Sequence, residues 1–533
     1  MPAPIPSVVL HDLTFSWPDG HRVLDAVSGS FPPGSTGLVG LNGVGKSTLL
    51  RLIAGKLRPT SGSVQAAGVV DYLPQRTDAD PSHTLVDLLG IRSIVDAIAA
   101  IERGAINPAL FDTIGADWDI EERAIATLSA AGVDIDDLNR PVTTISGGEA
   151  TVAALAGIRM RGADIALLDE PTNNLDAHGR TRVHDLIGAW GGPVIVVSHD
   201  LELLELMQHT AELRAGSLTL YGGPYSAFRE QVSRDQEAAE RAVRSAEHAV
   251  RVEKRQRIAA AERIAHSQRQ GKKDAANRKY IGAVVNDRRN SAEKTQGKQR
   301  SLLDDRMQSA QRSLQEAESR IRDDDRLGID LPDPAVPPGK RIAEFTGSDG
   351  RTIIIQGPER IAITGQNGVG KTTLLEGLIS GVAAAPGTAA AVAHVHRIGK
   401  LSQRLDNLDD AASVMENVTR VAPHVPRVEL RNRLARLLVR GTMVDRPVGA
   451  LSGGERFRVA LAQVLLTDPP PQLIVLDEPT NNLDLQTAEQ LIDALGAYRG
   501  AIIVVSHDRG FLDRLKLNAE FELDAAGLLT AMR

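Results

Sequence analysis

The sequence contains the same four motifs twice and in the same order, and this internal repeat constrains the fold more than any other feature. The last three pairs lie 306 to 308 residues apart. We therefore expect two homologous domains on either side of an intervening segment. The four pairs are GLNGVGKST (40–48) and GQNGVGKTT (365–373), ISGGE (145–149) and LSGGE (451–455), IALLDEPTNNLD (165–176) and LIVLDEPTNNLD (473–484), and IVVSHD (195–200 and 503–508).

Each copy predicts an α/β domain. The apolar runs before LDE and within VIVVSH and AIIVVSH are unbroken, which is typical of parallel strands buried on both faces. A chain of 533 residues is also too long for one hydrophobic core. We expect a first domain at 1–228, a helical linker at 229–326 and a second domain at 327–533.

Composition excludes several classes of protein. The chain has no cysteine, so disulfide scaffolds, cysteine-ligated metal sites and thiol catalysis are excluded. No apolar run approaches the roughly 18 residues of a membrane span. The N-terminal MPAPIPSVVLH lacks the basic and apolar regions of a signal peptide. We therefore expect a cytoplasmic protein with no membrane insertion.

Charge is unevenly distributed along the chain. The whole sequence has a net charge of −7, whereas residues 229–326 hold 24 Lys and Arg against 17 Asp and Glu. Within 254–300 the balance is 14 bases against 4 acids. This split indicates a basic segment that meets a polyanion and is carried between two acidic domains.

The glycine-rich motif GxxxxGK[ST] follows a predicted strand and opens a predicted helix in both copies, which is the context of a phosphate-binding loop. Its glycines let backbone N–H groups surround a β-phosphate at a helix N-terminus. We expect Lys46 and Lys371 to pair with the β- and γ-phosphates, and Ser47 and Thr372 to ligate Mg²⁺. A chance glycine-rich turn is the alternative, and two copies in the same context argue against it.

An acidic pair ends an apolar strand in each copy. Asp169 and Asp477 stand where a carboxylate can hold Mg²⁺ through water, and Glu170 and Glu478 follow directly. A glutamate at this position can orient or deprotonate the water that attacks a γ-phosphate. We therefore predict Glu170 and Glu478 as catalytic residues rather than as parts of a solvated turn.

Phosphate loop, SGGE, LDEPTNNLD and SHD, in this order, resemble the motifs of the ATP-binding cassette (ABC) ATPases over nearly all of both domains. The resemblance implies two P-loop ABC-type ATPase domains that bind ATP with Mg²⁺. It implies that His199 and His507 are catalytic switch histidines that touch the γ-phosphate. It further implies that Asp176 and Asp484 are D-loop residues.

The resemblance also implies a set of ATP-binding residues. Trp17 matches an adenine-stacking aromatic, for which Phe345 is a weak substitute in the second copy. Gln75 and Gln403 match a glutamine that is implied to bind Mg²⁺, together with the hydroxyl and the aspartate of the same copy. The other members are Gly40, Asn42, Gly43, Val44, Gly45, Lys46, Ser47, Thr48, Asp169, Ser146, Gly147, Gly148, Glu149, Gly365, Asn367, Gly368, Val369, Gly370, Lys371, Thr372, Thr373, Asp477, Ser452, Gly453, Gly454 and Glu455.

In this family two cassettes form a head-to-tail sandwich. We therefore expect a monomer in which ATP on Lys46 is closed by residues 452–455 and ATP on Lys371 by residues 146–149. ISGGEATVAAL and SHDLELL in the first copy lack basic residues that LSGGERFRVAL and SHDRGFL carry in the second. We expect the two sites to differ in the strength or timing of hydrolysis.

The segment between the copies predicts an antiparallel helical hairpin. A stripe of small apolar residues runs through its first half, and Gly271, Gly282 and Gly297 are expected in the turn region. With Tyr280 as its one aromatic, the basic middle fits phosphate neutralisation better than base stacking. A solvated coiled coil that serves solubility is the alternative. The second half carries a heptad seam made of Leu303, Met307, Ala310, Leu314, Ala317 and Ile321.

The whole layout resembles the ABC-F family, which has paired cassettes joined by a basic helical linker. The spacing from Lys46 to Ser146 exceeds that from Lys371 to Ser452 by 19 residues, which is compatible with the small arm of this family, near 90–135. In that family the linker enters the ribosome beside the P-site tRNA, and members tune translation or dislodge antibiotics. We therefore expect contacts to rRNA and P-site tRNA from Lys272, Lys273, Arg278, Lys279, Arg288 and Arg289.

Two other classes of function fit the sequence less well. The energy subunit of a membrane drug-export transporter would recruit separate membrane partners, but the long basic linker has no role there. Excision-repair ATPases need cysteine-ligated zinc, which this chain cannot supply, and condensin-like ATPases have far longer coils.

Overall fold

The computed structural model describes residues 8–75, 83–173, 175–214, 216–276, 301–319, 331–382, 385, 387–401, 407–481 and 483–532. The chain divides into two compact units. One unit is made of residues 1–226 and 325–533 and holds both motif copies, and the other, residues 227–324, holds the basic segment.

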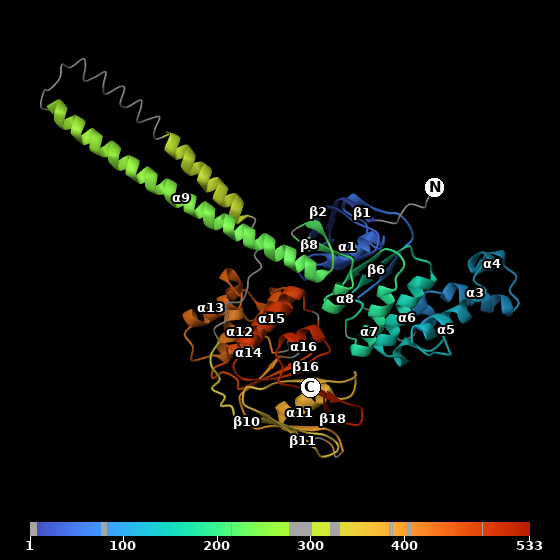
Figure 1. Ribbon diagram of the computed structural model, residues 1–533. Helices are drawn as coiled ribbons and strands as arrows, with labels where there is room; N and C mark the ends of the chain where they lie inside the picture. The colour runs from blue at the N-terminus through green and yellow to red at the C-terminus, as the bar shows by residue number, and fades with distance from the viewer. Residues whose placement is uncertain are drawn as a thin grey trace. The chain divides into compact units, whose positions relative to one another are not determined.

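A six-stranded sheet forms the centre of the first copy (Figure 1). Its first five strands pair in parallel and its last is antiparallel, in the order β5 (Val70–Leu73), β6 (Ile165–Asp169), β7 (Val194–Val197), β3 (Ser35–Val39), β8 (His209–Arg214) and β9 (Ser217–Gly222). Every residue of β6 and β7 is buried, which accounts for the unbroken apolar runs in the sequence. The first copy also has a separate antiparallel sheet, whose strands follow the order β2 (Arg22–Phe31), β1 (Val8–Ser16) and β4 (Ser61–Ala66).

The helices of the first copy place the motifs at the carboxyl ends of these strands. Three of them, α3, α4 and α5, occupy the region near 90–135 in which the sequence suggested an arm. The helices are α1 (Lys46–Ile53), α2 (Leu85–Leu89), α3 (Arg92–Glu102), α4 (Pro108–Ile114), α5 (Ile120–Ala130), α6 (Gly147–Met160), α7 (Ala177–Gly188) and α8 (Leu201–Glu205), with a 3₁₀ turn at Val142–Thr144.

The second copy repeats this topology. Its six-stranded sheet has the order β14 (Ile398–Leu401), β15 (Leu473–Asp477), β16 (Ala501–Val505), β12 (Arg360–Thr364), β17 (Ala519–Leu523) and β18 (Leu529–Ala531). Its antiparallel sheet has the order β11 (Thr352–Gln356), β10 (Arg341–Thr346) and β13 (Ala390–Ala393). Its helices are α11 (Lys371–Ser380), α12 (Val414–Val421), α13 (Arg427–Arg436), α14 (Gly453–Leu465), α15 (Leu485–Ala497) and α16 (Arg509–Arg514), with 3₁₀ turns at Gly441–Asp445 and Val448–Ala450.

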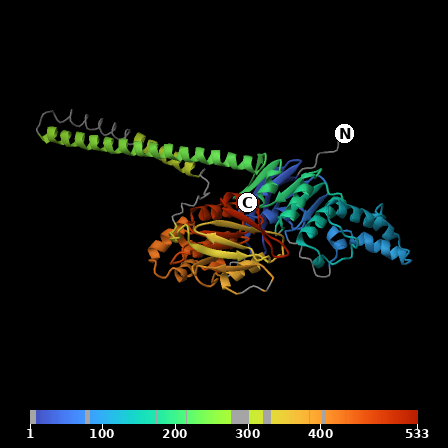
Figure 2. The same cartoon turned by 60° about the horizontal axis from the view of Figure 1, so that its bottom comes forward.

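The second unit is built around α9 (Tyr225–Ala276), a helix of 52 residues. Figures 1 and 2 show it as one unbroken helix with a second helix, residues 301–318, beside it. The ion pair between Arg257 and Asp304, 3.3 Å from Nε to Oδ1, joins the two helices. The expectation that Gly271 belongs to the turn region is wrong, because α9 continues through it to Ala276.

The described positions of the heptad seam face inward in the second helix. Leu303, Met307, Ala310 and Leu314 are each less exposed than their neighbours, and Ala317 is buried. Ile321 lies outside the described residues. None of the described helices is both long enough and apolar enough to cross a bilayer.

Candidate active sites

Each phosphate loop ends on a glycine whose backbone only glycine adopts easily. Gly45 has φ 105° and Gly370 has φ 96°, and each directly precedes the helix that its lysine begins. These conformations turn the chain sharply, so that the first N–H groups of α1 and α11 point into the loop. The loops therefore have the geometry of an anion site at a helix N-terminus.

The two lysines of these loops are buried, with 6% and 7% of their surface exposed. Nζ of Lys46 donates to the carbonyl oxygens of Gly40 at 2.7 Å and Leu41 at 3.1 Å. Nζ of Lys371 donates to those of Gly365 at 2.7 Å and Gln366 at 2.8 Å. Burial lowers the pKa of both lysines. The ammonium groups are therefore held at the centres of the two loops.

A hydroxyl and an aspartate lie side by side at each loop. Oγ of Ser47 donates to Oδ1 of Asp169 at 3.0 Å, and Thr372 hydrogen-bonds Asp477 in the same way. Burial raises the pKa of both aspartates. A hydroxyl and a carboxylate at this separation fit the oxygen ligands that Mg²⁺ prefers, one bound directly and one through water.

The two glutamates that follow these aspartates have strained backbones. Glu170 has φ 52° and Glu478 has φ 46°, a region in which non-glycine residues are rare. Each amide donates to the neighbouring strand, Glu170 to the carbonyl of Val197 at 2.8 Å and Glu478 to that of Val505 at 2.9 Å. Such strain persists where the surrounding structure fixes it, and it concentrates at functional sites. Here it turns each glutamate at the end of its strand toward the switch histidine.

The glutamate and the switch histidine form a close pair in each copy. Oε2 of Glu170 accepts from the amide of His199 at 3.3 Å, and Oε2 of Glu478 accepts from that of His507 at 3.4 Å. The other carboxylate oxygen, Oε1, lies 3.1 Å from Nε2 of His199 and 3.5 Å from Nε2 of His507. Among the described residues these buried Oε1 atoms form no hydrogen bond. Each oxygen therefore has hydrogen-bonding capacity that the described residues do not use.

Burial sets the protonation of these pairs. It raises the pKa of Glu170, and it raises the pKa of Glu478 to about 7. It lowers the pKa of His199 and brings the pKa of His507 to about 4. The histidines are therefore neutral near pH 7 and can accept as well as donate a hydrogen bond. Nε2 of His507 lies 3.0 Å from Nζ of Lys371.

The SGGE motifs are helix N-caps. Oε2 of Glu149 accepts from the amide of Ser146 at 2.8 Å, and the amide of Glu149 donates to Oγ of Ser146 at 3.2 Å. Ser452 and Glu455 form the same capping box, with distances of 2.8 and 3.4 Å. The serines and the first glycines are exposed, so each motif presents a helix N-terminus to solvent.

A cavity of about 460 Å³ contains much of the first site. Trp17, Lys46, Ser47 and Gln75 line it, together with Glu170, His199 and Arg180. The rings of Trp17 and Phe15 form a T-shaped pair with their centroids 5.0 Å apart, and Trp17 also lines the cavity. Phe345 is only 2% exposed and belongs to the core around β10, so the suggestion that it replaces Trp17 is wrong. Gln403 lies outside the described residues.

The second copy contributes to the same cavity. Thr480, Asn481 and Asp508 line it, whereas the described lining residues do not include the signature residues 452–455. Oδ2 of Asp484 accepts a hydrogen bond from the amide of Asn42 at 3.0 Å. In the first copy Asp176 caps α7 by accepting from the amide of Gly179 at 2.9 Å. Closure of either site by a signature motif stays a prediction.

Several residues near the sites were missed by sequence reasoning. The hydroxyl of Tyr72 donates to Oδ2 of Asp169 at 3.1 Å, and Nε2 of His184 lies 2.9 Å from Oδ2 of Asp200. Arg180 lines the cavity between the two copies. Tyr72 lies three residues before Gln75, and Arg180 lies four residues after Asp176, but the sequence contains no pattern that predicts the contacts of their side chains.

Comparison with known proteins agrees with this geometry. The family described as "ABC transporter" matches residues 24–173 and 350–481, which together are more than half of the chain. The chain therefore belongs to the ATP-binding cassette family, and its two α/β domains are ATPase domains. Within that family it is a member of the ABC-F group, as its tandem-cassette relatives indicate.

Two of these relatives are from Escherichia coli (strain K12). The "Probable ATP-binding protein YheS" is 31% identical over 92% of this chain and 75% of its own length. The "Energy-dependent translational throttle protein EttA" is 29% identical over 93% of this chain and 89% of its own length. An archaeal ribosome recycling factor, aABCE1, solved in complex with the ribosomal stalk protein aP1, shares the fold, with a TM-score of 0.54 over 98% of this chain and 89% of that chain at 19% identity.

Proposed function

We propose that the protein is an ATP-hydrolysing factor that acts on the ribosome in the cytoplasm, either to tune translation or to protect the ribosome from antibiotics. The observation that carries the proposal is the position of the basic segment, with 24 Lys and Arg against 17 Asp and Glu, between two ATPase cassettes. A polyanion such as rRNA or tRNA is the partner that such a segment fits. The relative EttA, named a translational throttle, supports the choice of the ribosome.

In this proposal the domains are residues 1–228, 229–326 and 327–533, and one chain acts as a monomer that closes its two cassettes on ATP. Lys46 and Lys371 hold the β- and γ-phosphates. Mg²⁺ would neutralise part of the phosphate charge. The hydroxyl and the aspartate at each loop would hold it, together with Gln75 in the first copy and Gln403 in the second. Trp17 would stack on the adenine of the first ATP.

The catalytic step follows from the glutamate and histidine pair. In each copy Oε1 of the glutamate, Glu170 or Glu478, would orient the water that attacks the γ-phosphate and accept its proton. The neutral histidine would hydrogen-bond the γ-phosphate. The exposed N-terminus of each signature helix would complete the site in the other copy.

Ribosome binding tests the proposal directly. Glu170→Gln and Glu478→Gln together should leave ATP binding intact and lower ATP turnover by about 10²-fold or more, because Gln cannot take the proton. The ATP-bound double variant should co-sediment with ribosomes in a sucrose gradient and inhibit translation. Glu202→Gln, at an exposed position of α8, is the control and should behave as the unaltered protein. A double variant that hydrolyses ATP normally would contradict the catalytic assignment.

Removing positive charges from the linker tests whether it binds the ribosome through phosphate groups. Replacing Lys272, Lys273 and Arg278 with Gln should weaken ribosome binding and lower the slope of log K against log salt by about 2, since each lost phosphate contact is worth about 0.7 to 0.9. Replacing Lys279, Arg288 and Arg289 as well should deepen the loss. The matched control replaces three arginines that form ion pairs within α9, Arg234, Arg244 and Arg251. Unchanged affinity and salt slope would make the linker a spacer.

The transporter alternative predicts a different result. An energy subunit of a drug exporter would fractionate with membranes and not with ribosomes. Cell fractionation with and without ribosome dissociation at low Mg²⁺ separates the two outcomes.

A further inference from the structure

The two copies differ in the part of the chain that would meet the base of a nucleotide. In the first copy the turn between β1 and β2, residues 17–21, lines the same cavity as Lys46 through Trp17 and His21. Val23, two residues after this turn, lines it as well. A base attached to a triphosphate on the first loop would therefore meet this turn, where Trp17 offers an aromatic ring for stacking.

The second copy has a turn with the same backbone hydrogen bonds. The amide of Trp17 donates to the carbonyl of His21 at 2.9 Å, and the amide of Gly347 donates to that of Arg351 at 2.9 Å. In both turns the fourth residue is a glycine whose amide donates back to the first residue at 2.9 Å. The third residue is an aspartate in both, and its Oδ1 accepts from the amide of the fifth residue at 2.9 and 3.0 Å. Gly347 therefore takes the place of Trp17.

The surroundings of Gly347 belong to the backbone of another turn. A Cβ at Gly347 would lie 3.5 Å from the backbone nitrogen of Leu529 and 3.7 Å from the carbonyl oxygen of Gly527. The amide of Ser348 donates to the same carbonyl of Gly527 at 2.9 Å. The turn between β17 and β18 thus packs against the position from which the indole of Trp17 extends in the first copy.

The apolar side chain beside the phosphate loop is also missing. A Cβ at Gly45 would lie 2.7 Å from Cγ1 of Val23. A Cβ at Gly370, the equivalent glycine, would meet no atom of the described residues within 4 Å. The second loop therefore has open space where the first has a wall that a base could contact.

No other aromatic ring of the second copy is available to replace Trp17. Residues 327–533 contain five aromatic residues, and all five lie within the part of the chain that the structure describes. Four are at most 4% exposed, and the fifth packs against the core around β10. The four are Phe345, Phe457, Tyr498 and Phe511, and the fifth is Phe521.

We propose that the Lys371 site holds its nucleotide through the triphosphate and not through the base, so that it accepts any nucleoside triphosphate, whereas the Lys46 site also reads the base through Trp17. The inference rests on the proposed function, in which both loops bind a nucleotide. It assigns the two sites different substrate classes, a purine nucleotide at the first and an unselected nucleoside triphosphate at the second.

Equilibrium binding of nucleotides with Mg²⁺ to single-site variants tests the proposal. Lys371→Ala leaves only the Lys46 site, which should bind ATP about fivefold more tightly than CTP, because the larger purine ring stacks more strongly. Lys46→Ala leaves only the Lys371 site, whose dissociation constants for ATP, GTP and CTP should agree within about twofold. In the Glu170→Gln background, in which only the Lys371 site turns over, kcat/KM for the three nucleotides should agree equally well.

Trp17→Ala in the Lys371→Ala background should weaken ATP binding about tenfold and bring ATP and CTP within about twofold of each other. Trp118→Ala is the matched control and should leave both constants unchanged. The ring of Trp118 is 49% exposed, pairs with Phe111 at 5.9 Å between centroids, and is not among the described residues that line the cavity.

A Lys371 site that prefers ATP to CTP about fivefold would overturn the inference, because some group other than an aromatic ring of the second copy would then read the base. A preference for ATP that survives Trp17→Ala at the Lys46 site would overturn it as well. Failure of the proposed function gives a different result. The unaltered chain should bind two nucleotides and each lysine variant one, and two nucleotides bound in both variants would mean that the sites themselves are wrongly assigned.

Discussion

Nε2 of His507 lies 3.0 Å from Nζ of Lys371, so the switch histidine and the phosphate-loop lysine of the second site form one hydrogen-bonded unit. Because an ammonium can only donate, His507 must accept through Nε2 and is neutral. Its pKa of about 4, lowered by burial and then by the charge of Lys371, agrees with this.

This relationship predicts the effect of changes at His507. His507→Gln retains a hydrogen-bonding side chain and should lose less ATP turnover than His507→Ala, in which Lys371 keeps only its two loop carbonyls. Steady-state ATPase assays in the Glu170→Gln background measure the difference, expected to be about tenfold for a lost charged hydrogen bond. Equal rates for the two variants would contradict this role.

Asp484 has two separable roles. Its Oδ1 caps α15 by accepting from the amide of Thr487 at 2.7 Å, and its Oδ2 accepts from the amide of Asn42 at 3.0 Å. Asp484→Ala removes both and should lower the free energy of unfolding by about 1 kcal/mol through the lost cap. Asp484→Asn keeps a capping oxygen and should unfold at nearly the same temperature as the unaltered protein.

Both changes at Asp484 should still alter ATP turnover at the Lys46 site, because the charge beside Asn42 is lost in each. Thermal unfolding and ATPase assays in the Glu478→Gln background separate the two roles. Wild-type turnover in both variants would mean that the contact to Asn42 is not used.

The buried carboxyl of Glu478 should make stability depend on pH. Burial raises its pKa from an ordinary 4.5 to about 7, so the folded protein holds a proton that the unfolded chain releases. The resulting stability is present below about pH 4.5 and is lost as pH rises through about 7. Glu478→Gln removes this dependence.

At pH 8.5 the Glu478→Gln variant should therefore have a free energy of unfolding up to about 3 kcal/mol higher than that of the unaltered nucleotide-free protein, and it should unfold at a higher temperature. This gain in stability should shrink toward pH 5. Scanning calorimetry at the two pH values measures it. Glu202→Gln provides the exposed control. A gain that is the same at both pH values would rule out titration of Glu478 as the cause.

Two glycines of the first phosphate loop should differ in their tolerance of alanine. Gly40 has φ 152°, and a Cβ there would lie 2.4 Å from the carbonyl oxygen of Leu213. Gly43 has φ 81° but open space around its Cβ position. Gly43→Ala should cost about 1 kcal/mol of backbone strain, and Gly40→Ala at least about 2 kcal/mol, because the backbone must also move. Chemical denaturation tests this order, and equal losses would contradict it.

The fold was predictable where function and local structure use the same residues. The repeated motifs predicted the α/β class, and the apolar runs at 165–169 and 194–197 are the buried strands β6 and β7. Ser146 and Glu149 were predicted only as residues of the SGGE motif, and the structure shows that they also form a capping box at the start of α6.

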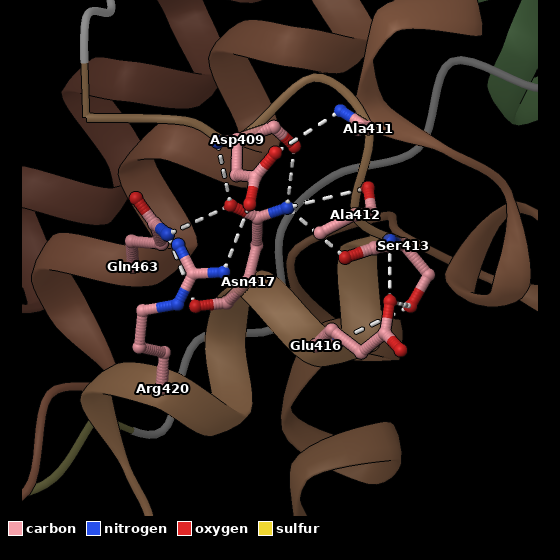
Figure 3. A network of polar contacts seen from close by, with 8 residues as sticks. All are labelled: Asp409, Ala411, Ala412, Ser413, Glu416, Asn417, Arg420 and Gln463. Carbon is pink, nitrogen blue, oxygen red and sulfur yellow. Dashed lines mark hydrogen bonds and ion pairs between the residues drawn. The ribbon is translucent and has the colours of Figure 1, made fainter.

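What the sequence could not predict depends on contacts between distant segments. Asn42 and Asp484 are 442 residues apart, and Asn417 and Gln463, which are hydrogen-bonded to each other (Figure 3), are 46 apart with no periodicity that relates them. Phe345 is an aromatic residue of the kind that can stack on a base, and only the packing around β10 shows that it belongs to the hydrophobic core. The positive φ of Glu170 is likewise imposed by tertiary structure, because no residue preference favours it.

The length of α9 has a mechanical consequence. A continuous helix of 52 residues is about 78 Å long, and it behaves over that distance as a stiff lever. A rotation of about 5° at one end moves the other by about 7 Å, more than one helical turn.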